Sequence, residues 1–218
     1  MNNYKFLRIR AYLQSPVIAD KFLPLDGVLY YHAVREKMGP QLAAKPNESF
    51  VREYQGIKLP FFVAGKGITW FYHCSFAQWP EHKIENSSFK VKQTDHMKFD
   101  GYLKENVKRV DIARGKYKAY HIKFYYRYAP YVDWYCFGDP IEIQRLLNFC
   151  THIGKNTGDG WGAVKNWEIE DCPEDWSIRG PQNKLMRAVP MDGNRGFLYG
   201  IRPSYWNPRH IFNCKMPE

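Results

Sequence analysis

A glycine-rich loop is the segment of this chain whose residue types and spacing are best suited to binding an anion. Residues 152–163 contain four glycines within nine positions: Gly154, Gly158, Gly160 and Gly162. Glycine lets a ligand approach the backbone closely, but ordering it is entropically costly. A helix-to-strand turn needs only two or three special residues. We therefore expect the backbone N–H groups of this loop to meet an anion, as amide concavities do elsewhere.

Side chains of the same loop could complete such a site. Lys155 would supply positive charge beside Asn156, Trp161 would offer a ring for stacking, and Asp159 would turn outward or hydrogen-bond within the loop. The alternative is that Gly162 relieves crowding where strand meets helix and that Trp161 belongs to the core. The loop lacks the GxxxxGK[ST] pattern, and it does not lie at a strand-to-helix turn as a GxGxxG motif would. A nucleotide-binding enzyme is therefore disfavoured.

Histidine could supply acid–base chemistry of the kind that a metal-independent endoribonuclease needs. His32, in a predicted helix, is the obvious candidate, with Tyr31 and His121 as partners. A half-buried structural histidine is the stronger interpretation of His32, because it lies beside the apolar stripe of its helix. The other histidines form no recognisable pair. We therefore expect no catalytic residue.

The cysteines favour a reducing compartment. They are odd in number, widely spread and without a Cys-x-x-Cys pair: Cys74, Cys136, Cys150, Cys172 and Cys214. This pattern is typical of free thiols in a cytoplasmic protein. Cys150 and His152 come closest to a metal-binding pair, but no second pair follows at zinc-finger spacing. We expect no metal and no cofactor.

Composition indicates a polyanionic partner. The 218 residues carry a formal net charge of +10, and aromatic residues make up 17% of them. A basic, aromatic-rich chain suits RNA or single-stranded DNA, where bases stack on rings while cations follow phosphates. The alternative use of the rings is to fill a β-rich core. The N-terminus has no secretory signal and no apolar run approaches the ~20 residues of a membrane helix, so no membrane partner is expected.

The predicted elements begin with a strand over residues 4–13. Its inward positions are Leu7, Ile9, Ala11 and Leu13. Its other face mixes rings with guanidinium groups, which suits RNA: Phe6, Arg8, Arg10 and Tyr12. A helix then begins at Asp26 as N-cap and ends at Gly39. Two short β runs follow, with a turn at residues 65–67.

In the second half, the segment YVDWYCFG predicts a strand that leads into a second helix. Asp139 is the predicted N-cap and Pro140 the first residue of this helix, which buries Ile143, Leu146, Leu147 and Cys150 and ends at Gly154. The glycine loop and a last strand to Glu170 follow. This order predicts an α+β, ferredoxin-like sandwich over residues 1–170. Residues 171–218 are proline-rich and are predicted to be an irregular extension packed on the same domain.

A basic hairpin arm is predicted as an insertion at about residues 83–120. Between residues 100 and 130, eight lysines and arginines face only three acidic residues. The segment ARGKYK predicts a tight turn at the tip, where Arg114, Lys116 and Lys118 would reach toward nucleic acid. The alternative is a solvated hairpin whose lysines protect an edge.

Three stretches resemble a known family. They are SPVIADKFLPLDGVLYYHAVREKMG near the start, FGDPIEIQRLLNFCTHIGKNTGDGWGAVKNWEIE around the glycine loop, and YGIRPSYWNPRHIFNC near the end. Together they resemble the CRISPR-associated RAMP superfamily, and within it the Cas-five-like (Csf-three) subunit of type IV CRISPR effector complexes. Residues 40–120 match no part of this pattern. The family often has an arginine in the glycine loop, where this chain has Lys155, Asn156 and Thr157.

The resemblance implies a non-catalytic, cytoplasmic subunit that binds the 5′ handle of the CRISPR RNA and caps a filament in defence against mobile DNA. Its partners would be the filament backbone subunits, large-subunit-like proteins and possible target DNA. The predicted RNA-binding residues are Arg8, Arg10, Arg114, Lys116, Lys118, Lys155, Asn156, Gly158, Gly160 and Trp161. Two alternatives remain, namely a CRISPR-RNA-processing endoribonuclease and a basic RNA-binding domain unrelated to CRISPR.

Overall fold

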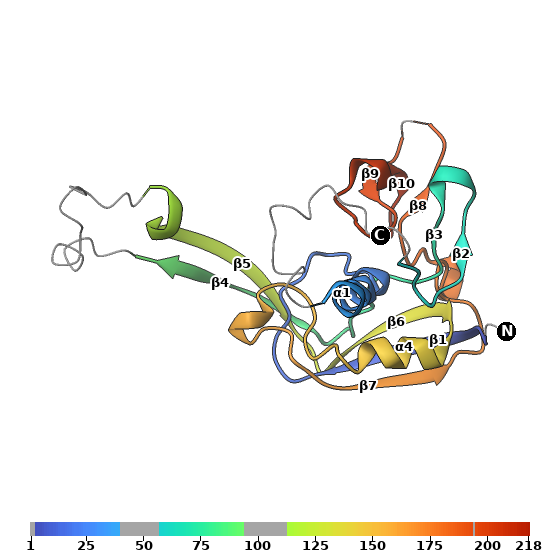
Figure 1. The fold of residues 1–218 in the computed structure, drawn as a ribbon, viewed down its shortest axis with the longest axis horizontal. Helices are drawn as coiled ribbons and strands as arrows, with labels where there is room; N and C mark the ends of the chain where they lie inside the picture. The colour runs from blue at the N-terminus through green and yellow to red at the C-terminus, as the bar shows by residue number, and fades with distance from the viewer. Residues whose placement is uncertain (1–2, 40–56, 94–112, 194) are drawn as a thin grey trace.

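An antiparallel sheet of order β6-β1-β7 forms the centre of the fold (Figure 1). This computed structural model describes residues 3–39, 57–93, 113–193 and 195–218. The helices and longer strands are β1 (Lys5–Leu13), α1 (Leu25–Met38), β4 (Ile84–Lys92), β5 (Tyr120–Tyr128), β6 (Tyr131–Gly138), α4 (Pro140–Leu147) and β7 (Val164–Asp171). The short strands are β2 (Val63–Ala64), β3 (Phe71–Tyr72), β8 (Val189–Pro190), β9 (Phe197–Gly200) and β10 (Ile211–Lys215). Helices and antiparallel sheets thus combine in one chain, which confirms the predicted α+β class.

The strand β1 lies in the middle of this sheet, paired with β6 and β7, and one of its two faces is apolar. Leu7, Ile9 and Ala11 are at most 1% exposed, as their alternation predicts. Ile9 pairs with Trp134 of β6 on one side and with Ile169 of β7 on the other. The central strand therefore supplies the floor of the main core.

Both helices cover this apolar face. Leu25 and Leu29 of α1 belong to the same core cluster as the buried row of β1, and so do the inward residues of α4. The start of α4 is as predicted, because the Asp139 carboxylate accepts the Ile141 N–H at 3.0 Å and Pro140 is the first helical residue. Within the described ranges, no helix covers the opposite face of the sheet.

Two predicted helix boundaries are wrong. Pro24 rather than Asp26 occupies the N-cap of α1, and the Asp26 side chain is fully buried inside the first turn. The helix α4 ends at Leu147 with Asn148 as its C-cap, so Gly154 lies in the loop beyond and does not cap this helix. The local sequence pattern could not reveal that Asp26 is buried, because the groups that contact its side chain come from the far end of the chain.

Residues 61–78 border the free edge of β6. Antiparallel bridges join Phe61 to Gly138, Cys74 to Cys136, and Gln78 to Asp133. The strands β2 and β3 pair within this segment, on either side of the turn predicted at residues 65–67. That turn is therefore confirmed.

The arm is a two-stranded ribbon of β4 and β5 that stands away from the body (Figure 1). The paired strands β4 and β5 lie where the arm was predicted, although the second strand runs to Tyr128, beyond the predicted limit near residue 120. The segment from Arg114 to Lys118 contains a 3-10 turn immediately before β5. Residues 94–112, which lie outside the described ranges, separate it from β4, so it is not by itself the turn between the two strands.

The C-terminal extension is more regular than its prolines predict. The strands β8, β10 and β9 form a small antiparallel sheet in that order. A second core packs there, made of Phe71, Phe76, Ala188, Ile201 and Cys214. Strands of two to five residues are too short for an alternating pattern to be recognised in the sequence.

Candidate nucleic-acid interface

The segment of residues 15–20, between β1 and α1, joins the base of the arm to the glycine loop. On one side, Val17 and Arg127 exchange backbone hydrogen bonds of 2.8 and 2.9 Å. On the other, the N–H of Lys155 donates to the carbonyl of Ile18 at 2.6 Å. Three parts of the chain that are far apart in sequence thus form one surface.

The glycine loop contains two kinds of glycine, and the first kind serves the fold. Gly154 (φ +85°) and Gly162 (φ +70°) adopt left-handed backbone. A Cβ at Gly154 would overlap the carbonyl oxygen of Ile18, and one at Gly162 would overlap that of Ile153. Both glycines are therefore required for close backbone packing. Gly160 shares the left-handed backbone (φ +87°), so three of the loop's four glycines have a structural reason.

The second kind faces open space. A Cβ at Gly158 or Gly160 would meet no atom within 4 Å, and both residues are exposed. Gly158 needs no positive φ, so its lack of a side chain serves no visible packing purpose. Asn156, also exposed, has a left-handed φ of 57°. This stretch is the part of the loop that a ligand could approach.

Two other loop residues contact the arm. The ring centroid of Trp161 lies 5.3 Å from that of Phe124 and 5.1 Å from that of Tyr126, both on β5. Asp159 accepts a hydrogen bond from Lys90 of β4 at 2.5 Å. The structure thus gives Trp161 a packing role at this junction, and its stacking on RNA stays a prediction.

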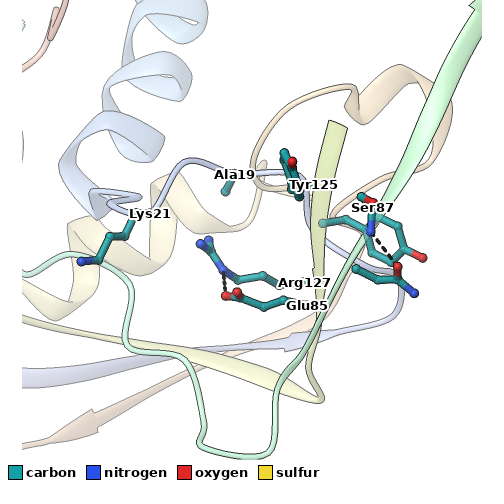
Figure 2. Close-up of a pocket in the computed structure, with 8 residues that line it drawn as sticks. Ala19, Lys21, Glu85, Ser87, Tyr125 and Arg127 are labelled. Atoms are coloured by element: carbon teal, nitrogen blue, oxygen red, sulfur yellow. Dashed lines mark hydrogen bonds and ion pairs between the residues drawn. The ribbon is translucent and has the colours of Figure 1, made fainter. Parts of the chain in front are cut away.

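A cavity of about 610 Å³ opens where the arm meets the body, and we name it the arm-base cavity (Figure 2). Its lining includes Ala19, Lys21, Glu85, Ser87, Tyr125 and Arg127. Figure 2 shows Arg127 and Glu85 side by side in its middle, joined by a hydrogen bond of 2.8 Å from Nε to the carboxylate. Arg127 also donates to the carbonyl of Asp20 at 3.1 Å. The guanidinium group is therefore fixed in place.

A second cavity, of about 590 Å³, is also lined by the segment between β1 and α1, through Ala19 and Asp20, and we name it the helix-side cavity. Its lining includes Tyr31, His32, Arg35, His152, Lys155 and Tyr205. Ala19 borders both cavities. The two openings therefore lie next to each other along one surface.

The charge of this surface is positive. Lys21 and Arg35 are exposed, and within the described ranges no carboxylate lies within ion-pair distance of either. Each instead lies near a ring, with Lys21 Nζ 5.1 Å from the Phe22 centroid and the Arg35 guanidinium 5.6 Å from that of Tyr31. Cations next to rings are the combination that binds single-stranded nucleic acid.

Lys155 is less available than predicted. Its Nζ donates to Asp20 at 2.7 Å, although both side chains are well exposed. An exposed pair of this kind is weak and opens easily. Lys155 therefore stays within reach of a phosphate that competes with Asp20.

The predicted Arg8 and Arg10 lie on the helix-free face of the sheet, and both are paired there. Arg8 donates to Glu170 at 2.5 Å, and Arg10 donates twice to Asp133, at 2.7 and 2.8 Å. The hydrogen bonds that Arg10 donates to Asp133 raise the pKa of Arg10 further above its ordinary value. Cross-strand acids therefore neutralise this face, which the pattern of one strand alone did not reveal.

The predicted arm residues Arg114 and Lys118 are exposed, beside the start of β5. The side chain of Lys116 lies outside the described part of the chain. These residues precede the start of β5, which lies at the end of the arm away from the body (Figure 1). The structure thus does not group them with the glycine loop.

His32 lines the helix-side cavity next to Tyr31, with their ring centroids 5.2 Å apart. Only 8% of its surface is exposed, and burial together with the nearby Arg35 lowers its pKa. His121 lies on β5 against Phe89 at 4.6 Å and is not among the described residues lining that cavity. The structure does not bring the two histidines together there.

Sequence reasoning missed Lys21 and Arg35 as candidate interface residues. Each lies in a different element, so no local spacing connects them. The sequence signal for such residues is an aromatic residue next to a cation. Which other cations are paired with acids, and so unavailable to a ligand, becomes visible only in the fold.

Within the described ranges, no group of three or more histidine, cysteine or acidic side chains could hold a metal ion. Among the same residues, no helix is long and apolar enough to cross a membrane. All five cysteines are free, and burial raises the pKa of Cys150 to about 12. The thiol of Cys150 is therefore protonated at neutral pH.

Comparison with known families gives a match over almost the whole chain. The model of a family described as "CRISPR type IV associated protein Csf3" matches residues 5–217. No curated protein matches the chain. The family match includes the arm, the glycine loop and the C-terminal extension.

Proposed function

The chain belongs to the family of CRISPR type IV associated protein Csf3, and from this premise we propose that it is a non-catalytic subunit that binds the 5′ handle of a CRISPR RNA. In this proposal it caps the end of a filament of backbone subunits in a type IV effector complex. The family match confirms the resemblance found in the three sequence stretches. The RNA, the other subunits and possible target DNA are the proposed partners.

The order of strands supports a ferredoxin-like fold for this role. The antiparallel order β6-β1-β7 has both helices on one face. Residues 71–78 run along the free edge of β6 through bridges such as Cys74 to Cys136. Counting that interrupted segment as a strand gives the four-stranded order of a ferredoxin-like sheet.

The observation that carries the proposal is the continuous basic and aromatic surface around residues 15–21. The arm-base cavity, the helix-side cavity and the open part of the glycine loop adjoin one another there. Lys21 and Arg35 lie on it without a carboxylate partner in the described part of the chain. RNA bound on such a surface is contacted as a single strand, through phosphates and stacked bases.

The endoribonuclease is the second candidate, and His32 in the helix-side cavity is the observation in its favour. Cleavage would need a base for the 2′-hydroxyl and an acid for the leaving oxygen. His32 is almost fully buried, and its lowered pKa keeps the ring neutral at neutral pH. His152 lines the same cavity, but the hydrogen bond given for its ring is to Thr151 and not to His32. A buried neutral histidine of this kind fits a structural role better.

Sequencing of the RNA that copurifies with the protein tests the proposed function. We expect molecules that share one repeat-derived 5′ end and differ in their guide portion. Copurified RNA with no common 5′ end would refute handle binding. RNA with a common 5′ end but no enrichment of repeat sequence would favour the RNA-binding domain unrelated to CRISPR.

A further inference from the structure

We infer that the arm-base cavity holds one unpaired nucleobase that carries an exocyclic amino group, such as cytosine, and excludes uracil. The inference rests on the proposed function, because it assumes that single-stranded RNA crosses this surface. It goes further in assigning a base-reading role to a site built by β4, β5 and residues 19–21.

The size and shape of the cavity suit a nucleotide. Its volume of about 610 Å³ lies within the range of sites that enclose small organic ligands. Tyr125 lines it and is 67% exposed, so its ring is available for stacking. Base-on-ring stacking contributes about 1–3 kcal/mol per base in single-strand binders. The cavity therefore offers a plate for a base.

Glu85 is the residue that favours a base over a phosphate. Its carboxylate lies in the cavity and its side chain is 58% exposed, while Arg127 binds only one of its two oxygens. The hydrogen bond from Arg127 lowers the pKa of Glu85, so the carboxylate is ionised at neutral pH. An ionised carboxylate repels phosphate but accepts a hydrogen bond from an amino group, as it does from the amino group of cytosine.

Uracil differs from cytosine at position 4, the position that would face Glu85. Cytosine presents an amino donor at position 4, whereas uracil presents a carbonyl oxygen there. If that oxygen faced Glu85, two hydrogen-bond acceptors would lie together without a proton between them. Asn86 and Ser87, which also line the cavity, offer neutral polar groups to the rest of the base edge.

Cations at the rim would hold the flanking phosphates. Lys21 is exposed at the edge of the cavity and has no carboxylate partner among the described residues. Arg127 is fixed by Glu85 and by the carbonyl of Asp20. The arrangement thus combines in one cavity a ring for stacking, a carboxylate that accepts hydrogen bonds and a cation that can bind phosphate.

The test compares the binding of short oligocytidine and oligouridine RNAs of equal length to the full chain, by fluorescence anisotropy at one salt concentration. We expect the wild type to prefer oligocytidine by about fivefold, the scale of one charged hydrogen bond to a base edge. Glu85→Gln retains an oxygen for Arg127 and gains an amide donor for uracil, so the preference should fall close to one. Glu170→Gln is the matched control, because Glu170 is an exposed acid paired with Arg8 on the helix-free face. It should leave the preference unchanged.

The outcomes separate this inference from the proposed function. Equal binding of both RNAs by the wild type, or a preference that survives Glu85→Gln in a variant with unchanged melting, overturns base reading by this cavity and leaves RNA binding intact. Loss of the preference in Glu170→Gln as well overturns the specific role of Glu85. Failure of the wild type to bind either RNA overturns the proposed function and the inference together.

Discussion

The ammonium group of Lys90 lies 2.5 Å from a carboxylate oxygen of Asp159, and this contact joins the arm to the glycine loop. Both side chains are exposed, so the pair adds little to folding stability. Its larger effect is on the electrostatic potential at the glycine loop. The one acid in the open part of the loop is partly neutralised by a lysine from the arm, and that lysine is in turn withheld from RNA.

Removing this acid should strengthen RNA binding. We expect Asp159→Asn to tighten binding of repeat RNA by about twofold to fivefold at low salt, because it frees Lys90 and removes a charge that repels phosphate. The gain should shrink as salt rises, while the melting temperature stays unchanged. Anisotropy titrations at several salt concentrations measure this, and weaker binding in the variant would mean that the loop does not face RNA.

The two kinds of glycine should respond differently to substitution. Gly162→Ala places a Cβ against the carbonyl of Ile153 at a positive φ, so we expect the melting temperature to fall by about 5 °C or more. Gly158→Val projects into open space and should leave melting unchanged while weakening RNA binding severalfold. Thermal melting and anisotropy on both variants test this. If Gly158→Val alters neither quantity, the open stretch is only a turn.

The end of the arm should contribute through charge. Replacing Arg114 and Lys118 together with alanine should reduce the slope of log affinity against log salt by about one unit for each phosphate that the variant no longer binds. Both side chains are exposed, so the fold should not change. A slope equal to that of the wild type would mean that the arm end is solvated and contacts no RNA.

Much of the central sheet could be predicted because each of its elements carries its own signal. The alternation of Leu7, Ile9 and Ala11 and the pair Asp139–Pro140 act within a few residues, and both are confirmed. The predicted cap at Asp26 failed because its position depends on residues more than a hundred positions away. Signals of that range are not visible in a single sequence.

The candidate site was harder to predict for the same reason. The availability of a cation depends on its partner, and Arg8 is neutralised by Glu170 through a strand pairing that no local pattern reveals. Lys21 became a candidate only when the fold showed no acid near it within the described ranges. The sequence singled out the loop through its four glycines together, and only the fold separates Gly158, which meets no neighbour, from Gly154 and Gly162, which pack against backbone carbonyls.

The protein should not cleave RNA. Incubation of the purified chain with repeat RNA, with and without EDTA, should leave the RNA intact over hours. The lowered pKa of His32 arises from burial and from Arg35, which is the environment of a packed histidine. Specific cleavage that disappears in a folded His32→Ala variant would replace the proposed function by the endoribonuclease.

A buried ion pair fastens the C-terminal extension to α1, and we expect it to control stability. Arg187 and Asp26 are fully buried with Nη2 and Oδ2 3.7 Å apart, and Tyr205 donates to the same carboxylate at 2.5 Å. Arg187→Met should destabilise the protein by about 3–5 kcal/mol, because it leaves a buried carboxylate without its cation. Denaturant unfolding at neutral pH measures the loss. The double variant with Asp26→Asn should recover part of it.

The pH dependence of the same variants gives an independent check. Burial raises the pKa of Asp26 and the charge of Arg187 opposes that rise, so Arg187→Met should raise the pKa of Asp26 further. A carboxyl group whose pKa is higher in the folded state binds its proton more tightly there than in the unfolded state. The stabilisation that this proton gives is lost as pH rises from the unfolded pKa through the folded one. Arg187→Met should therefore lose less stability, relative to the wild type, at about pH 5 than at about pH 7. Asp26→Asn should remove this difference. A loss that is equal at both pH values would mean that Arg187 acts through its hydrogen bonds to the carbonyls of Tyr72, Cys74 and Ile201 rather than through charge.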